Sequence, residues 1–258
     1  MLLTPEQLDR FDRDGFLILH DIFSVEEIET LRGAMPGLMA AEGTENAREA
    51  DGTSVRNVFG VHRRDRHFAD LTHHPRLLGP ARQILGEDFY VQQCKVNVKD
   101  AFIGDGFDWH TDFHTHHSRD GVPKPLALNL HVFLDDVTEF NGPLWFVPGS
   151  HRMNVPAVRD VDGEKWELWT VPRSAVKATI DQAGLVSAVG RRGTVLIFGD
   201  QLLHGSPENI SPWSRWIYSV IVNPMSNQPT KKGLPRNQHE QDFVAMRPVA
   251  DDCLRPTA

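Results

Sequence analysis

The sequence predicts a mainly β fold with flanking helices, and three observations lead to this fold class. From about residue 89 onward, short segments rich in Val, Ile, Leu and Phe recur, and Gly, Pro, Asn and Asp separate them. The first 88 residues instead carry helix-capping motifs and apolar residues at helical spacing. The chain has 258 residues, of which 40% are hydrophobic, so it is long enough to bury one sizeable core. Many short strands with turns between them favour a β-sandwich or barrel, and we expect a double-stranded β core with helices packed outside it.

Capping motifs place the expected helices in the first part of the chain. Residues 4–7 (TPEQ) form a capping box with Pro at the first helical position, and the segment FLILHDIF (16–23) that follows this helix resembles a strand more than a helix. A second capping box at 24–27 precedes apolar residues at positions i, i+3 and i+7, and Pro36-Gly37 is expected to end that helix. A third helix is expected within residues 74–88.

The strands are expected in the second part of the chain, after a polar, Gly-containing segment (40–56) that is typical of a surface loop. They are predicted within the segments FYVQQCKVNVKDAF, LALNLHVFLDDV, GPLWFVPGS, GTVLIFGDQLLHGS and RWIYSVIVNP. In the first of these, polar and apolar residues alternate, so one face of the strand carries Gln93, Lys95, Asn97 and Lys99. That face is either solvated or turned inward, where four polar side chains would need partners.

Composition and charge limit the possible functions. The formal net charge is −8 and there is no run of Lys and Arg, so nucleic acid and anionic membranes are poor candidates for partners. No segment has the roughly 18 consecutive apolar residues of a membrane span, and the N-terminus lacks the pattern of a secretory signal. Two cysteines, Cys94 and Cys253, form neither a disulfide framework nor a thiolate metal site, although one disulfide stays open. We expect a soluble, cytoplasmic protein that acts on a small molecule, either as a monomer or as a homodimer.

The segment FDWHTDFHTHH (107–117) carries the most specific signal. In a strand, residues i and i+2 face the same way, so His110 and Asp112 project together and can share a metal ion. A third ligand can come from His204, which follows a later strand-like run. Two histidines and one carboxylate on one face of an octahedron are typical of non-haem Fe(II) oxygenases. Without the third ligand, His110 would read as an ordinary strand histidine and Asp112 as a turn carboxylate.

Two further residues point to the partner of this metal. Ser206 follows His204 closely, and Arg215 lies eleven residues after His204. If a dicarboxylate chelates the metal at one end, its other end needs a charge-assisted partner, and a guanidinium matches a carboxylate bidentately. Outside the metal context, Arg215 would be read as a surface arginine on a strand.

Taken together, these motifs resemble the phytanoyl-CoA dioxygenase superfamily of Fe(II)/2-oxoglutarate oxygenases. Within it, the sequence is most similar to the bacterial branch of ectoine hydroxylase and the free-amino-acid hydroxylases that act on proline or leucine. The matching segments cover most of the chain and are GFLIL, VRNVFGVHRRD (55–65), HPRLLGPARQIL (74–85), QCKVNVK (93–99), FDWHTDF (107–113), EFNGPLWFVPGSH (139–151) and LLHGSPENISPWSR (202–215).

The resemblance implies a double-stranded β-helix, which is a cupin-like jelly roll with the metal in its mouth. It implies one Fe(II)/2-oxoglutarate dioxygenase domain over 1–258, with a helical part (about 1–88), a jelly-roll core (about 89–225) and a C-terminal tail (about 226–258). Iron would be bound by His110, Asp112 and His204. The cosubstrate 2-oxoglutarate would be bound by Arg215 and Ser206, with Lys99 and Asn97 as further candidates. The implied reaction consumes O2, releases succinate and CO2, and hydroxylates an unactivated C–H bond.

Asp112 also bears on the outcome of the reaction, because related halogenases have a small residue in place of this carboxylate. Its presence favours hydroxylation over halogenation. The candidate substrate residues lie near the expected metal and are Gln93, Lys95, Phe107, His116, Asn129 and Asn223. Lys95 is the candidate for an anion such as a substrate carboxylate. At His116 the relatives tend to have Trp, so we expect a substrate more polar than ectoine, proline or leucine, such as another free amino acid or a derivative.

Two alternatives remain at this point. The same cofactors can support desaturation, epoxidation or cyclisation of a natural-product intermediate. A jelly-roll protein can also hold zinc without redox chemistry, as a hydrolase, an isomerase or a binding module, but such a protein would not need the dicarboxylate anchor of Ser206 and Arg215.

Overall fold

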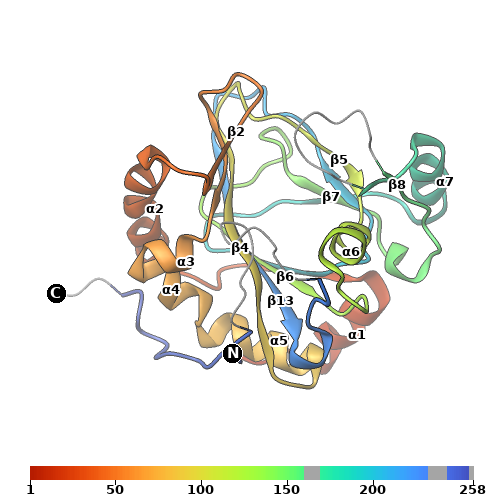
Figure 1. Ribbon diagram of the computed structural model, residues 1–258, viewed down its shortest axis with the longest axis horizontal. Coiled ribbons are helices and arrows are strands. Elements are labelled where there is room, and N and C mark those ends of the chain that lie inside the picture. Colours follow the sequence, from red (N-terminus) through yellow and green to blue (C-terminus); the bar gives the residue numbers. More distant parts are fainter. Residues whose placement is uncertain (160–168, 232–242, 256–258) are drawn as a thin grey trace.

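The computed structural model describes residues 1–159, 169–231 and 243–255, and its centre consists of two antiparallel β-sheets that face each other (Figure 1). The larger sheet has seven strands in the order β1-β11-β6-β13-β4-β3-β2, and the smaller has six in the order β10-β7-β12-β5-β9-β8. The strands are β1 (Phe16–Leu19), β2 (Asn46–Arg48), β3 (Val55–Phe59), β4 (Phe89–Lys99), β5 (Phe107–His110), β6 (Leu128–Phe133), β7 (Leu144–Phe146), β8 (Val158–Arg159), β9 (Trp169–Thr170), β10 (Val186–Ala188), β11 (Val195–Gly199), β12 (His204–Ser206) and β13 (Arg215–Pro224). The expected mainly β fold with a double-stranded core is confirmed.

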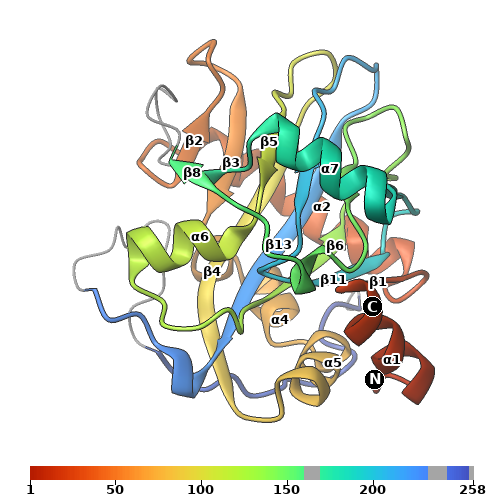
Figure 2. The ribbon, with the colours of Figure 1, turned by 90° about the vertical axis from the view of Figure 1, so that its right-hand side faces the viewer.

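Helices cover the outside of both sheets. They are α1 (Pro5–Asp14), α2 (Val25–Ala40), α3 (Val61–Arg64), α4 (Arg66–Thr72), α5 (Pro75–Leu85), α6 (Asp112–Thr115) and α7 (Arg173–Ala183), with short turns η1 (His116–Asp120, π-helical), η2 (Ser150–Arg152, 3-10) and η3 (Met225–Asn227, 3-10). The helices α2, α3 and α4 lie along the larger sheet beside β4, whereas α7 lies on the other side of the molecule, beside β8 (Figure 1). Both views place α1 and α5 at one end of the molecule (Figure 2).

The two faces of the larger sheet have different contents. On its outer face, alternate residues of β4 and β13, such as Val96, Tyr218 and Val220, pack with residues of the helices, such as Leu31 and Phe68, in the main hydrophobic cluster. A smaller hydrophobic cluster lies between the sheets. It includes four phenylalanine rings, one each from β1, β6, β7 and β11: Phe16, Phe133, Phe146 and Phe198. The rest of the inner face carries polar side chains, and this is where the site described below lies.

One expected helix boundary is wrong. Pro36-Gly37 was expected to end the second helix, but α2 continues to Ala40. Proline removes one backbone hydrogen bond and costs about 3 kcal/mol in a helix interior. Two buried side chains, Met35 (0% exposed) and Leu38 (8% exposed), flank the proline in the main cluster, and their burial offsets this cost.

The expected surface loop at 40–56 is also wrong in part. Within it, β2 pairs with β3 in an antiparallel hairpin that extends the edge of the larger sheet. The polar composition hid this strand because it lies at the sheet edge, where side chains need not be apolar. The predicted helices at the two capping boxes, the helix within 74–88 and the five predicted strand segments are confirmed.

Residues 243–255 return along the helical side of the molecule. The backbone N–H of Met246 donates to the carbonyl of Phe89, and the N–H of Val249 donates to the carbonyl of His73. Phe243 packs edge-to-face on Tyr90, with ring centroids 5.0 Å apart. Among the described residues, no helix has both the length and the apolar character that crossing a bilayer requires.

Candidate active site

A group of three potential metal ligands lies at the two central strands of the smaller sheet, β12 and β5. His110 is the last residue of β5, and its direct partner across the antiparallel pairing is His204, the first residue of β12. Thr111 has extended backbone angles (φ −119°, ψ 138°), so Asp112 at the start of α6 projects to the same side as His110. The ligand atoms of the three residues all lie within 4.8 Å of one another.

Hydrogen bonds fix the orientation of these side chains. The Nδ1–H groups of His110 and His204 are placed to donate to the carbonyls of Asp108 (2.6 Å) and Leu202 (2.9 Å), which leaves each Nε2 facing the carboxylate. The distances from Asp112 Oδ1 are 3.5 Å to Nε2 of His110 and 3.9 Å to Nε2 of His204. The other oxygen, Oδ2, accepts from the Asn129 side chain at 2.8 Å.

The electrostatics of the group suit a divalent cation. Burial lowers the pKa of His204 to about 4, so its imidazole is neutral at pH 7. Burial opposes ionisation of Asp112, but the neighbouring His204 and His110 outweigh it and hold the pKa of this carboxyl well below its usual value. Two imidazoles and one carboxylate are the donor set of a mononuclear Fe(II) site, so these residues fit the metal that the sequence predicts.

The three residues open onto a cavity between the two sheets. Besides them, its lining consists of Lys95, Asn97, Phe107, Asn129, His131, Leu144, Phe198, Gly205, Ser206, Arg215, Ser219 and Ile221. Six of the sequence-predicted residues therefore share this cavity with the metal group. The lining comes from strands of both sheets, so the double-stranded core is what brings these distant segments together.

Arg215 is the most informative residue of the lining. It is 1% exposed, and its Nε has no hydrogen-bond partner among the described residues. Burial lowers the pKa of its guanidinium to about 9. A buried guanidinium with unused donors is costly unless an anion binds to it. Ser206 lines the same cavity, so the two residues can hold one carboxylate together.

Lys99 supports this end of the cavity from behind. It is the direct cross-strand partner of Arg215, and its Nζ donates to Ser206 Oγ at 2.9 Å and to the carbonyl of Pro207. Burial and the adjacent Arg215 lower the pKa of Lys99 to about 6. The family resemblance makes Lys99 a candidate for binding the cosubstrate; in the structure it is not among the lining residues, and its Nζ contacts Ser206, which is.

The pKa of Lys99 gives a prediction for stability. Between pH 6 and the usual lysine pKa of about 10.5, the unfolded chain binds one proton more than the folded chain, so Lys99 makes the free energy of unfolding rise with pH. Lys99→Met lacks this contribution. Across this range we therefore expect the unfolding free energy of wild type, relative to that of the variant, to rise by about 1 kcal/mol per pH unit. Urea denaturation of the metal-free protein at pH 6.5, 7.5 and 8.5 measures it, and a pH-independent difference would contradict it.

Four predicted residues lie outside the lining: Lys99, Gln93, His116 and Asn223. The side chain of Gln93 accepts from Lys95 Nζ at 2.9 Å, so it supports a lining residue. His116 starts the π-helical turn η1 and is 5% exposed, with no partner for its Nδ1 among the described residues. Asn223 is bound to Gln92 (2.6 Å) and to Asn227 (2.9 Å), so its polar groups are used within the protein.

The strand alternation stops after the metal ligands. His114 and His116 do not continue the face of His110 and Asp112, because the strand ends at His110 and the chain turns into α6 and η1. His114 instead hydrogen-bonds Thr111 Oγ1 at 2.5 Å. Sequence reasoning also missed His131 and Ser219, which line the cavity. Each lies on the same strand face as another inward residue, His131 with Asn129 and Ser219 with Arg215, but a single histidine or serine in an apolar strand is not a specific signal.

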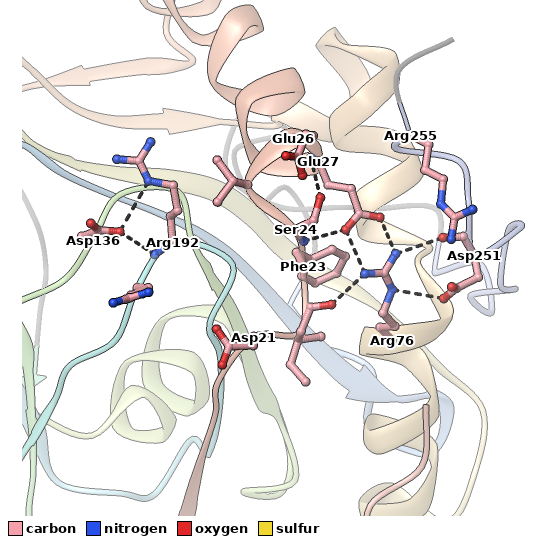
Figure 3. Close-up of a pocket in the computed structure, with 13 residues that line it drawn as sticks. Asp21, Phe23, Ser24, Glu26, Glu27, Arg76, Asp136, Arg192, Asp251 and Arg255 are labelled. Atoms are coloured by element: carbon pink, nitrogen blue, oxygen red, sulfur yellow. Dashed lines mark hydrogen bonds and ion pairs between the residues drawn. The ribbon is translucent and has the colours of Figure 1, made fainter. Parts of the chain in front are cut away.

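A larger surface groove, of about 1120 Å³, lies elsewhere in the molecule, around the start of α2 (Figure 3). Its charged residues largely neutralise one another. Arg76 is bound to Glu27 (2.5 Å) and Asp251 (3.1 Å), and Arg192 is bound to Asp136 (3.4 Å). In the described part of the chain, the grouping of potential metal ligands is found in the inter-sheet cavity and not in this groove.

Comparison with known proteins agrees with this site. The family model "Phytanoyl-CoA dioxygenase (PhyH)" matches residues 11–217. The chain is 37% identical to the ectoine dioxygenase of Bordetella bronchiseptica, covering 96% of this chain and 86% of the relative. It is 39% identical to that of Halomonas elongata, covering 88% of this chain and 71% of the relative.

Solved structures give the same result. The structure of EctD from S. alaskensis with 2-oxoglutarate and 5-hydroxyectoine superposes with a TM-score of 0.85 at 32% identity, covering 96% of this chain and 87% of that one. The structure of the same protein with bound Fe has a TM-score of 0.82 at 31% identity, with the same coverage. The resemblance found in the sequence is confirmed, and the chain belongs to the phytanoyl-CoA dioxygenase family.

Proposed function

We propose that this protein is an Fe(II)- and 2-oxoglutarate-dependent dioxygenase that hydroxylates a C–H bond of a small polar substrate, such as a free amino acid or a derivative. The observation that carries the proposal is one cavity with two anchors. At one side lies the His110, Asp112 and His204 group, and at the other lies Arg215 with an unused buried donor. A dicarboxylate that chelates a metal and also needs a guanidinium partner suits this arrangement.

Each part of the protein then has a defined task. His110, Asp112 and His204 would hold Fe(II), and Arg215 with Ser206 would hold the distal carboxylate of 2-oxoglutarate. When bound, iron and 2-oxoglutarate supply the oxidising chemistry, in which O2 is consumed and succinate and CO2 are released. The chain itself fixes the geometry, and its inter-sheet cavity limits the access of water. Asn129 would orient Asp112 through their 2.8 Å hydrogen bond.

The relatives support both the cofactors and the class of substrate. The named relatives are ectoine dioxygenases, and EctD has been solved with bound Fe and with 2-oxoglutarate and 5-hydroxyectoine. Ectoine is a small polar molecule that carries a carboxylate. For this chain we propose the hydroxylation of another small polar acid.

Lys95 indicates that the substrate carries an anionic group. Its Nζ donates to Gln93, and burial lowers its pKa to about 8 while Asp112 opposes this shift. Among the described residues that line the cavity, Asp112 is the only carboxylate, and it would be bound to the metal. Lys95 is therefore left without an acidic partner, and we propose that it binds the substrate carboxylate. Phe107 and Asn129 line the same cavity as further candidate contacts.

A screen for coupled turnover tests the proposal. The iron-loaded protein is incubated with 2-oxoglutarate, O2 and a panel of free amino acids and related small acids, and succinate is measured. We expect succinate to rise with one group of substrates and mass spectrometry to show a product that gains one oxygen atom. A product that loses two hydrogen atoms would instead identify a desaturase or cyclase. If no substrate couples 2-oxoglutarate to turnover and zinc copurifies stoichiometrically, the proposal is wrong.

The proposed setting follows from the same features. A small polar substrate and diffusible cosubstrates are available in the cytoplasm, where we place the protein. We propose no nucleic-acid or membrane partner for a chain of net charge −8. A monomer or a homodimer is consistent with this function, and size-exclusion chromatography with light scattering distinguishes them.

His116 gives a prediction about selectivity. It is buried at the start of η1, close enough to Asp112 and Lys95 to interact with both electrostatically, and burial lowers its pKa. His116→Trp replaces a polar ring with an apolar one, and we expect turnover to shift toward more apolar amino acids. The ratio of kcat/KM for leucine to that for the best polar substrate measures the shift, with His114→Trp as the control. An unchanged ratio would show that His116 does not face the substrate.

A further inference from the structure

Two buried side chains in the cavity have no role in the site as described so far. His131 is 3% exposed and Ser219 is 1% exposed, and both line the cavity. Neither His131 Nδ1 nor Ser219 Oγ has a hydrogen-bond partner among the described residues. Buried polar groups are almost always paired in native proteins, so an unpaired couple that faces a binding cavity indicates a missing ligand.

The strand register places these two residues next to each other. His131 on β6 is the direct cross-strand partner of Ser219 on β13, and Ser219 is in turn the partner of Lys95 on β4. The three side chains therefore form one row across the inner face of the larger sheet. Because the row runs perpendicular to the strands, its members lie at the same depth in the cavity.

The position of this row along the cavity identifies what it can contact. Asn129 lies two residues from His131 on the same strand face and donates to Asp112, so the row is adjacent to the metal end. Arg215 lies four residues from Ser219, or about 13 Å along the strand, at the other end of the cavity. If a 2-oxo acid chelated the metal, the carboxylate next to its keto group would thus lie beside His131 and Ser219.

The chemistry of the pair suits a carboxylate. Burial lowers the pKa of His131 to about 3, with Lys95 as the next cause, so the ring is neutral at pH 7 and carries one N–H donor. The Ser219 hydroxyl supplies a second donor. The rings of His131 and Phe198 pack in a T-shaped arrangement with centroids 5.0 Å apart, which helps to hold the imidazole in place.

We propose that His131 and Ser219 bind the 2-oxo carboxylate end of the cosubstrate, while Arg215 and Ser206 bind its distal carboxylate. The pair is a second anchor that sets the orientation of the chelating end relative to the metal. This inference rests on the proposed function, because it takes 2-oxoglutarate as the ligand of the cavity.

Binding measurements with two 2-oxo acids test the proposal. 2-Oxoglutarate and pyruvate, which lacks the distal carboxylate, are titrated without O2 into Fe(II)-loaded wild type, His131→Leu, Ser219→Ala and Arg215→Met. The visible charge-transfer band of the chelate reports binding. We expect His131→Leu and Ser219→Ala each to weaken both ligands on the order of 10-fold. Arg215→Met should weaken 2-oxoglutarate alone.

Matched variants separate this effect from a general disturbance. His131→Gln keeps a donor and an acceptor and should recover part of the affinity that His131→Leu loses. Thr194→Val removes the hydroxyl of another buried residue (1% exposed), which has no hydrogen-bond partner among the residues that the structure describes. Thr194 does not line the cavity, so both affinities should stay at the wild-type value.

A second measurement needs no ligand. Since the unpaired atoms are unfavourable in the ligand-free protein, His131→Leu and Ser219→Ala should raise its Tm or leave it unchanged, and should reduce the further rise caused by 2-oxoglutarate. Unchanged affinity for both acids in both variants, with Arg215→Met still weakening 2-oxoglutarate, would overturn this inference alone. If wild type does not bind 2-oxoglutarate, the proposed function fails as well.

Discussion

His110→Ala is expected to abolish turnover and to weaken Fe(II) binding by more than the roughly 100-fold that loss of a hydrogen bond to a metal ligand causes. The reason is geometric. His110 and His204 are direct partners across β5 and β12, and with Asp112 they form the three-ligand face on which the metal would sit. Two remaining ligands cannot hold a labile divalent ion with the same affinity. Isothermal titration with Fe(II) under anaerobic conditions measures binding, and succinate formation measures turnover.

His114→Ala is the control for this variant. His114 belongs to the same histidine-rich segment, but it bonds Thr111 and is not one of the grouped ligands. The His114→Ala variant should therefore bind iron as wild type does. Near-wild-type Fe(II) affinity and turnover in His110→Ala would show that the metal lies elsewhere, and circular dichroism of the variant excludes loss of the fold as the cause of inactivity.

Arg215→Met is expected to raise the KM for 2-oxoglutarate between about 10- and 150-fold, which corresponds to roughly 1.5–3 kcal/mol for a charge-assisted hydrogen bond. Methionine fills similar space without charge, so the change isolates the carboxylate contact. Because Arg215 is buried and its Nε has no partner in the described part of the chain, the ligand-free variant should also be more stable than wild type. Initial rates at varied 2-oxoglutarate and thermal denaturation of the ligand-free protein measure the two effects.

Two further variants define the specificity of this result. Arg215→Lys keeps the charge but loses the bidentate geometry and should fall between wild type and Arg215→Met. Arg192→Met removes an arginine of the surface groove and should leave the KM for 2-oxoglutarate unchanged. A wild-type KM in Arg215→Met would show that the cosubstrate does not reach Arg215.

Sequence patterns located the site well where the local backbone was simple. His110 and Asp112 were correctly placed on one side because Thr111 continues the extended backbone between them. The strand pattern could not place His116, four residues later, because residue periodicity does not show where a strand ends and a π-helical turn begins. The helix pattern failed at Pro36 because tertiary burial outweighed a local helix breaker.

The cavity shows a different limit of sequence reasoning. Lys95 and Asn97 drew attention because polar and apolar residues alternate along their strand, and Arg215 because it follows His204 and can pair with a carboxylate. His131 and Ser219 stand in apolar strands, but a single histidine or serine there is usually an ordinary core residue with a partner. Only the three-dimensional structure distinguishes them, because the strand register sets Ser219 between Lys95 and His131, and neither Ser219 Oγ nor His131 Nδ1 has a hydrogen-bond partner among the described residues.

The alternation of side chains on β4, β6 and β13 has an evolutionary consequence. Along each of these strands, successive residues alternate between two roles. Those that point outward pack against the helices and stabilise the fold, and those that point inward line the cavity. A substitution at an inward position such as Lys95 can thus change which molecule is accepted while the packed layer is left intact. This separation makes the scaffold evolvable, because new specificities can arise without first acquiring compensating stability. A one-residue deletion in such a strand would exchange both sets at once, and lineages should therefore diversify by substitution within these strands and by insertion only in the loops between them.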